Sequence, residues 1–200
     1  MATDHPELPA DERGAANAAA LLRFLHLAGR LKDTPRAGWR LRGISTPESV
    51  AEHSHRVALL ALVLAPRAAP PLDVGRCVAM ALVHDLAEAL VGDITPYDGV
   101  PGDEKRRREA AAMRELAALA GDASLVSLWR EYDAAETAEA RFVKELDKLE
   151  TVLQAAEYAR DGSAAAGALD EFWANAGARL TSPVTRALLD ALRREREAGG

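Results

Sequence analysis

The sequence predicts an all-α fold, a single-domain helical bundle, from three observations. Alanine, the strongest helix former, is abundant, and β-branched residues are sparse. Apolar residues recur every three or four positions along nearly the whole chain, which is the period of one helix face. The chain of 200 residues is long enough for one hydrophobic core and short for two. We therefore expect one domain over residues 1–200.

Local signals delimit the first two expected helices. The first ends before Thr34-Pro35, because the residue that precedes a proline is displaced from the helical conformation. Its apolar face is expected to consist of Leu21, Phe24, Leu25, Ala28 and Leu31. After a loop over 33–47, Ser49 and Glu52 form a capping box, which starts a second helix that ends near Ala65. This helix is apolar on most sides, so we expect it to be buried.

The remaining helices follow from caps and breaks of the same kind. Asp73 is expected to cap a third helix that runs to Val91 and stops at Gly92. A highly charged fourth helix comes next, after a short loop. A fifth and a sixth helix are expected at about 125–132 and 138–159, and the C-terminal helices at about 167–197. The terminal helix begins at Ser182-Pro183, because proline is tolerated at the first helical position.

Composition excludes several classes of protein. No apolar run approaches the roughly 18 residues of a membrane span, and the net charge of −6 argues against a broad nucleic-acid-binding surface. The first residues are acidic, unlike a secretory signal, and the single cysteine, Cys77, points to a reducing compartment. We therefore expect a soluble, cytoplasmic protein without a nucleic-acid or membrane partner.

Titratable residues stand out within the third expected helix. His84, Asp85 and Glu88 lie in the segment 79–91, which is otherwise almost entirely apolar. Burying an unpaired carboxylate costs several kcal/mol, and a divalent cation is the simplest compensating partner. On a regular α-helix His84 and Glu88 share one face while Asp85 lies about 100° around, so one helix offers a ligand pair and a separate general base. A buried polar network that braces the bundle is the alternative.

Two further residues extend this pattern. Asp147 lies among apolar residues of the sixth expected helix, and His53 supplies a neutral nitrogen in the first turn of the second. Taken alone, Asp147 is as compatible with a solvated helix position as with a ligand. Together the residues follow the order His53, His84-Asp85, Asp147.

This ordered set resembles the HD-domain metal-dependent phosphohydrolases, helical bundles whose ligands are a histidine, an adjacent His-Asp pair and a distant aspartate. The segments 47–54 and 84–94 look like the 5′-deoxynucleotidase branch, in particular its HD-domain-containing protein 2-like members. Further matches are Arg36-Ala37-Gly38-Trp39, 104–109 and 142–148. They define a metal-binding core at about 36–158. Bacterial deoxynucleotidases carry an arginine before the tryptophan, where this chain has Gly38; Arg36 is expected to take over its role.

The resemblance implies a phosphomonoesterase that hydrolyses deoxyribonucleoside 5′-monophosphates to deoxynucleoside and phosphate. The implied metal ligands are His53, His84, Asp85 and Asp147. Such a mixed nitrogen and oxygen set suits Mn²⁺, Co²⁺, Fe²⁺ or Mg²⁺. Glu88 is the expected general acid/base, because four ligands are complete without it.

The substrate contacts are also implied by the resemblance. Arg36 would clamp the phosphate, Trp39 would pack on the sugar or base against a ribose 2′-hydroxyl, and Asp93 would help recognise the sugar. A role for Trp39 as a packing anchor is the alternative. In relatives of this branch Glu88, Asp93 and the Ile94 carbonyl would also be placed to hold a second metal ion.

Two other functions stay open. One is a different HD phosphohydrolase activity on a cyclic nucleotide, a nucleoside triphosphate or an alarmone, although the chain has no insertion long enough to cage a triphosphate. The other is a non-catalytic, metal-stabilised binding protein, which would have no use for the spare carboxylates Glu88 and Asp93. We also expect a homodimer, from the resemblance and from the large apolar residues of the fifth and C-terminal helices. Those residues are Leu125, Leu128, Trp129, Phe172 and Trp173.

Overall fold

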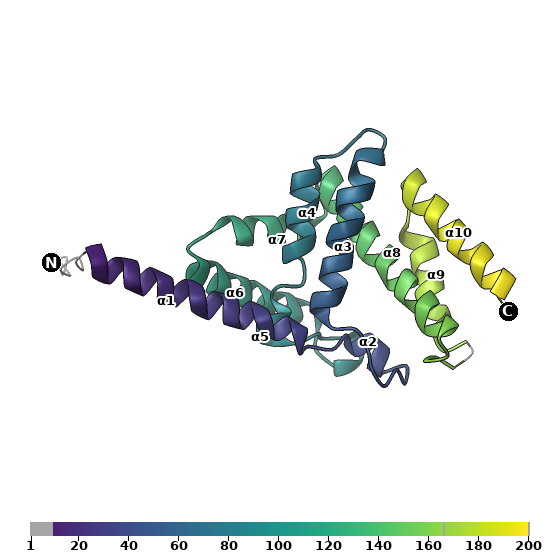
Figure 1. The fold of residues 1–200 in the computed structure, drawn as a ribbon, viewed down its shortest axis with the longest axis horizontal. Helices are drawn as coiled ribbons and strands as arrows, with labels where there is room; N and C mark the ends of the chain where they lie inside the picture. The colour runs from purple at the N-terminus through teal and green to yellow at the C-terminus, as the bar shows by residue number, and fades with distance from the viewer. Residues whose placement is uncertain (1–9, 166, 200) are drawn as a thin grey trace.

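The structure, a computed structural model, describes residues 10–165 and 167–199, and within them it is a helical bundle with no β-strand (Figure 1). Its α-helices are Ala10–Gly29 (α1), Ala37–Arg40 (α2), Val50–Leu64 (α3), Val74–Val83 (α4), Glu88–Val91 (α5), Gly102–Ala120 (α6), Ser124–Ala134 (α7), Ala138–Arg160 (α8), Asp170–Arg179 (α9) and Pro183–Gly199 (α10). Short 3₁₀ turns occupy Arg30–Lys32, Ala65–Arg67 and Pro96–Asp98. The predicted fold class is confirmed. The acidic residues Asp4 and Glu7 lie outside the described residues.

The main core forms where α3, α4 and α8 pack together, with α9 and α10 laid on the far side of α8 (Figure 1). Val57 of α3, Met80 of α4 and Leu146 and Leu149 of α8 are completely buried there. The expected burial of the second helix is correct for the face that packs on α4 and α8, whereas its Leu59, Leu62 and Val63 are about half exposed. These three helices also carry or adjoin the predicted metal ligands, so the core sets the relative positions of the site residues.

A second cluster lies at the other end of the molecule, where α1 packs on α5 and α6 (Figure 1). Here the expected apolar face of the first helix is partly wrong. Leu21 and Leu25 are 45% and 56% exposed, and the face that packs consists of Phe24, Leu27, Ala28 and Leu31. The apolar stripe of α1 covers more of the helix surface than the part that contacts α5 and α6, so Leu21 and Leu25 are left exposed.

Local capping predictions at α3 and α4 are confirmed. The Ser49 hydroxyl accepts a hydrogen bond from the Glu52 backbone N–H at 3.2 Å, and the Glu52 carboxylate accepts one from the Ser49 N–H at 2.6 Å. The Asp73 carboxylate accepts from the Arg76 N–H at 2.9 Å.

The third expected helix is not continuous. The helix α4 ends at Val83, and 84–87 wind more tightly, with hydrogen bonds from the Glu88 N–H to the Asp85 carbonyl and from the Leu86 N–H to the Val83 carbonyl. The Nδ1 atom of the His84 ring lies 2.7 Å from the Ala81 carbonyl oxygen. In a continuous α-helix this oxygen accepts a hydrogen bond from the backbone N–H of the residue four positions later. His84, Asp85 and Glu88 all line one cavity, and possible ligand atoms of His84 and Asp85 lie within 4.8 Å of one another and of His53.

The helical segment resumes as α5 after the break and stops at Gly92, as predicted. This residue adopts φ 75°, a conformation in the region that favours glycine, and it closes the short helix α5 through a bond from its N–H to the Glu88 carbonyl.

The C-terminal helices are tied to α8 by one buried carboxylate. Glu145 accepts hydrogen bonds from the Thr181 hydroxyl at 2.5 Å, the Ser182 N–H at 3.0 Å and the Thr185 hydroxyl at 2.6 Å. These bonds join α8 to the start of α10.

The surface argument for a homodimer does not hold. Trp129 and Trp173 are 5% and 7% exposed, and Leu125, Leu128 and Phe172 pack against the clusters of the same chain. The exposed large apolar residues of α1, α3 and α4 are instead Leu21, Leu22, Leu25, Leu59, Leu62, Val63 and Leu82.

Candidate metal and substrate site

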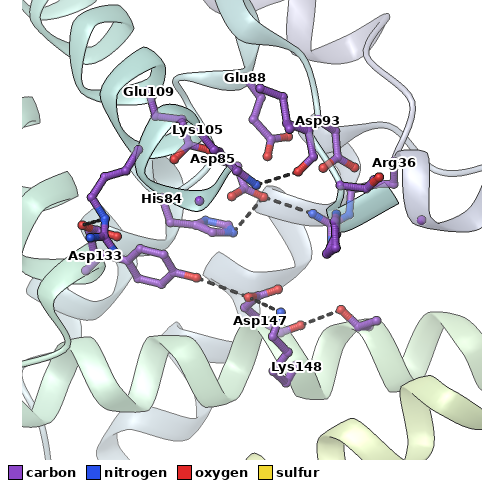
Figure 2. A pocket seen from close by; sticks show the side chains of 18 of the residues that line it. Arg36, His84, Asp85, Glu88, Asp93, Lys105, Glu109, Asp133, Asp147 and Lys148 are labelled. Atoms are coloured by element: carbon purple, nitrogen blue, oxygen red, sulfur yellow. Dashed lines mark hydrogen bonds and ion pairs between the residues drawn. The ribbon is translucent and has the colours of Figure 1, made fainter. Parts of the chain in front are cut away.

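A cavity of about 420 Å³ opens between the loop that precedes α3, the turn after α4, and helices α6, α7 and α8 (Figure 2). Its charged lining residues are Arg36, Asp85, Glu88, Asp93, Lys105, Arg106, Glu109, Asp133, Asp147 and Lys148. Carboxylates thus outnumber basic groups in this lining. Its volume falls in the usual range for small-molecule sites.

His53 lies at the buried end of this group of residues and is fully inaccessible to solvent. Its Nε2 atom is 3.4 Å from Asp147 Oδ1, 3.7 Å from Asp85 Oδ2 and 3.3 Å from His84 Nε2. One side of the imidazole therefore faces all three of the other predicted ligands.

The hydrogen bonds of the two histidines decide which ring nitrogens carry protons. His84 Nδ1 lies 2.7 Å from the Ala81 carbonyl oxygen, and His53 Nδ1 lies 2.5 Å from Glu150 Oε2. Both partners can only accept, so both Nδ1 atoms donate. In the neutral rings the lone pairs of the two Nε2 atoms then face each other across 3.3 Å, with Asp85 Oδ2 at 3.1 Å from the nearer one. A cation among these atoms would turn mutual repulsion into attraction, so the residues fit a divalent metal ion.

The raised pKa of His53 also indicates that this position favours a positive charge. Burial and the charge of Arg36 lower this pKa, but hydrogen bonds to Asp147 and Glu150 outweigh them and raise it to about 9. The protein thus stabilises positive charge at the atom that points toward the other ligands. A bound proton and a bound cation compete for this position.

The fourth predicted ligand approaches from α8. Asp147 Oδ2 accepts a hydrogen bond from the Tyr132 hydroxyl at 3.2 Å and lies 3.0 Å from Lys148 Nζ (Figure 2). Burial raises the pKa of Asp147, but the Lys148 charge and the bond with His53 lower it well below its ordinary value. The structure therefore brings His53, His84, Asp85 and Asp147 together from α3, the turn after α4, and α8, and keeps Asp147 ionised.

Arg36 enters the cavity from the loop before α2 and makes an ion pair with Asp85, its Nη1 atom 3.2 Å from Oδ2 (Figure 2). Burial alone would lower the pKa of the guanidinium, but the charges of Asp85 and Asp147 raise it above its ordinary value. For Asp85, burial raises the pKa, and His84 together with Arg36 lowers it below the usual range. Both groups are therefore charged.

The surroundings of Glu88 raise its pKa, whereas those of Asp85 lower the pKa of that residue. It is 5% exposed, and its Oε2 atom has no hydrogen-bond partner among the residues that the structure describes. Burial and the neighbouring charges of Asp85 and Asp93 raise its pKa well above the ordinary value. The protonated form of Glu88 is therefore favoured by its surroundings, whereas those of Asp85 favour the charged form.

Two of the three residues expected at a second metal ion are engaged in hydrogen bonds. The Asp93 carboxylate accepts a hydrogen bond from the Ala37 N–H at 2.8 Å, which fixes the start of α2 to the cavity. The Ile94 carbonyl accepts one from Lys105 Nζ at 2.8 Å, so a second ion at Ile94 would lie close to the charge of Lys105.

Trp39 is 2% exposed and contributes to the cavity wall beside Gly38 and Phe172. Its ring lies 4.5 Å from that of Phe172, and its Nε1–H donates to Glu48 Oε1 at 2.9 Å. The structure therefore gives Trp39 both the packing role and a place in the wall. Gly38 leaves room for a side chain, since an added Cβ would come no closer than 3.8 Å to Phe172.

Several residues of the site were not identified from the sequence. Tyr132, Phe172 and Glu150 lie in none of the matched segments, and Lys148 ends the matched segment 142–148 but was given no role. Glu150 had one signal: it follows Asp147 by three residues and is another carboxylate among apolar neighbours in the same helix. Glu145 has the same signal but serves the C-terminal helices, so this pattern alone does not separate the two roles.

The chain is similar to known proteins in both sequence and fold. The chain matches the model of a family described as HD domain over residues 28–186. It is 43% identical to the 5′-deoxynucleotidase HDDC2 of Bos taurus, over 99% of this chain and 95% of the relative. A conserved hypothetical protein of Pyrococcus furiosus superposes with a TM-score of 0.74 and 33% identity, over 86% of this chain and 99% of the other. A "predicted metal-dependent phosphohydrolase" of Magnetospirillum magnetotacticum superposes with a TM-score of 0.63 and 30% identity, over 90% and 96%.

Among the described residues, no helix combines the length and the apolar character that crossing a membrane requires.

Proposed function

The chain belongs to the HD domain family, and from that membership we propose that it is a 5′-deoxynucleotidase, a metal-dependent phosphomonoesterase that converts deoxyribonucleoside 5′-monophosphates to deoxynucleosides and phosphate. Full-length relatives named 5′-deoxynucleotidase support the substrate class. The observation that carries the proposal is the pair of facing histidine nitrogens with Asp85 beside them, next to a cavity that is lined by both Arg36, paired with Asp85, and the buried Glu88.

A divalent cation would be held by His53, His84, Asp85 and Asp147. When bound, it polarises the phosphate, makes a bound water more acidic and offsets the charge that develops on phosphorus. Mn²⁺, Co²⁺, Fe²⁺ and Mg²⁺ all suit two imidazoles and two carboxylates, so the identity of the ion is left to experiment.

Arg36 binds the phosphate group. Its ion pair with Asp85 holds the guanidinium at the cavity before substrate arrives, so less conformational entropy is lost on binding. The remaining N–H groups can donate charge-assisted hydrogen bonds to phosphate oxygens.

Glu88 donates the proton that the leaving group needs. Water attacks phosphorus and releases one proton to solvent, the bond between phosphorus and the 5′ oxygen breaks, and the 5′ oxygen gains the proton that Glu88 donates. Glu88 then regains a proton from solvent. Burial and the charges of Asp85 and Asp93 raise the pKa of Glu88, which suits a proton donor, and Glu88 lines the same cavity as Arg36 and Asp147. Asp93 and Trp39 contact the sugar and base, a role supported by their position in the cavity lining together with Phe172.

A phosphate-release screen tests this function. We would supply metal-stripped protein with each of Mn²⁺, Co²⁺, Fe²⁺ and Mg²⁺ and offer dAMP, AMP, dATP and a cyclic nucleotide. We expect release from dAMP in preference to AMP, and none without metal. Turnover of dATP or of the cyclic nucleotide alone would support another HD phosphohydrolase activity. Release from no nucleotide under any metal would support a metal-stabilised binding protein.

We also propose that the protein is a cytoplasmic homodimer. The exposed leucines of α1 are the best-placed contact surface, because they project from a helix that has few partners in its own chain. The cytoplasmic location rests on the lone Cys77, which is buried as a free thiol.

A further inference from the structure

We infer that Glu150 is a positioning residue for the metal site: it fixes the His53 ring so that Nε2 is presented to the cation. This inference rests on the metal dependence in the proposed function. It adds to the four ligands a carboxylate that touches neither metal nor substrate.

The geometry of Glu150 supports this role. Both Glu150 and His53 are fully buried, and His53 Nδ1 lies 2.5 Å from Glu150 Oε2. Since a carboxylate can only accept, this contact places the proton on Nδ1 and leaves Nε2 free for the ion. It also fixes the rotation of the ring, because turning it over would bring Nε2 to the carboxylate and Nδ1 to the site. Metal-ligating histidines are commonly held by such a partner, which also makes the ligating nitrogen more basic.

Arg56 holds Glu150 in turn. Its Nε atom donates to Glu150 Oε1 at 2.8 Å, and its Nη1 atom donates to Glu157 Oε2 at 2.8 Å. Glu150 thus accepts one bond on each oxygen, from His53 and from Arg56. A glutamine in its place accepts on one atom and donates from the other, so it can satisfy only one of these two donors.

The competing explanation is that Glu150 only braces α3 against α8 through Arg56. The chain offers a matched control for this, because Glu157 binds the same arginine from the same helix without touching His53. Glu157→Gln weakens the brace and leaves the histidine contact intact. Glu150→Gln disturbs both.

The test is a Co²⁺ titration of the full-length, metal-stripped protein, followed by the visible absorption of the bound ion, with far-UV circular dichroism to verify folding. We expect Glu150→Gln to bind Co²⁺ about 10- to 100-fold more weakly than the parent. The absorption spectrum of bound Co²⁺ should also change, because the His53 ring is no longer held. Glu157→Gln should bind within about twofold of the parent, as expected for a substitution outside the ligand's own contacts.

Glu150→Asp keeps the charge but is one methylene too short to reach His53, so its affinity should lie between those of Glu150→Gln and the parent. It replaces Glu150→Gln in the comparison if that variant does not fold. Parental affinity in the Glu150 variants, or an equal loss in Glu157→Gln, would overturn the inference while leaving the proposed function intact. A parent that binds none of Mn²⁺, Co²⁺, Fe²⁺ and Mg²⁺ would overturn the metal dependence itself, and this inference with it.

Discussion

At the scale of single residues, the contacts of each carboxyl group in the cavity determine the direction in which its pKa is shifted. His84 and Arg36 are in contact with Asp85 and lower its pKa, whereas burial and the charges of Asp85 and Asp93 raise the pKa of Glu88, three residues on. The two carboxyl groups therefore have pKa values shifted in opposite directions. The proposed roles, ligation for Asp85 and proton donation for Glu88, match these directions.

The role of Asp85 can be tested with Asp85→Asn, which keeps the size of the side chain and removes its charge. We expect the variant to lose bound metal after dialysis against Mn²⁺, and its Tm to stop responding to added Mn²⁺, because a ligand that binds the native state stabilises it. Elemental analysis and thermal denaturation measure both effects. Asp133→Asn is the control, since Asp133 also lines the cavity but pairs with Arg106. A full equivalent of metal in Asp85→Asn would contradict the assignment.

Glu88→Gln should separate catalysis from metal binding. The variant removes the acidic proton but none of the four proposed ligands, so we expect kcat to fall by about 10²- to 10⁴-fold with metal content unchanged. Steady-state phosphate release and metal analysis on the same samples make the comparison. Glu109→Gln, on the α6 side of the cavity beside Lys105, is the matched control and should stay within a few-fold of the parent. Loss of metal together with activity would make Glu88 a ligand instead.

The sequence predicted which residues meet at the site better than it predicted what holds them. His53, His84, Asp85 and Asp147 were identified because their order along the chain is distinctive. Their roles stay predictions until metal binding is measured. Glu150 was not identified, because a buried carboxylate in a helix looks the same in sequence whether it orients a histidine or ties down a neighbouring helix, as Glu145 does.

At the scale of helices, the ends were predictable where one local hydrogen bond sets them. Ser49 and Asp73 cap α3 and α4 as expected, and Gly92 ends α5. The break after Val83 was not predictable from helix periodicity, because it depends on the His84 ring binding the Ala81 carbonyl. This orientation of the ring is fixed by the pocket, which only exists in the folded chain.

The junction between α8 and α10 should be sensitive to pH. Burial raises the pKa of Glu145, but hydrogen bonds from Thr181, Thr185 and Ser182 outweigh it and lower the pKa below its ordinary value. A carboxylate whose folded-state pKa is lowered stabilises the protein above its unfolded-state pKa, and this contribution disappears as the pH falls through the folded-state value.

We therefore expect Glu145→Gln to lower the free energy of unfolding by about 1–3 kcal/mol near neutral pH. The difference between parent and variant should shrink as the pH falls below the ordinary range of a glutamate. Urea denaturation at a series of pH values measures it. Glu136→Gln, exposed just before α8, should leave the pH dependence of the parent unchanged. A difference that stays constant with pH would show that Glu145 acts through packing alone.

At the scale of the whole molecule, α1 packs against the body through its C-terminal part, by Phe24, Leu27 and Ala28. Its residues 14–19 are exposed, and Leu21, Leu22 and Leu25 present apolar surface to solvent as the helix extends away from the body (Figure 1). Helices gain most of their stability from packing an apolar face, so a second copy of the chain covering α1 would stabilise it.

Light scattering at micromolar concentration should accordingly return twice the 21.4 kDa mass of one chain. The double variant Leu22→Glu, Leu25→Glu should shift the protein toward the monomer mass, because it would bury two charges in the interface. Leu62→Glu, an equally exposed leucine on α3, is the control and should leave the dimer intact. A parent protein that scatters as a monomer would contradict the prediction, and dissociation by Leu62→Glu alone would move the interface to α3.

The four proposed ligands come from α3, the turn after α4, and α8, and they meet beside the main core. An ion bound there acts as a cross-link that any separation of α8 from α3 and α4 must break, whereas fraying of α1 or α10 leaves it intact. Amide hydrogen exchange should therefore slow unevenly when metal is added. Protection would rise where α3, α4 and α8 pack together and change little at the two ends of the molecule, so that metal sharpens the contrast between a rigid centre and independently opening ends.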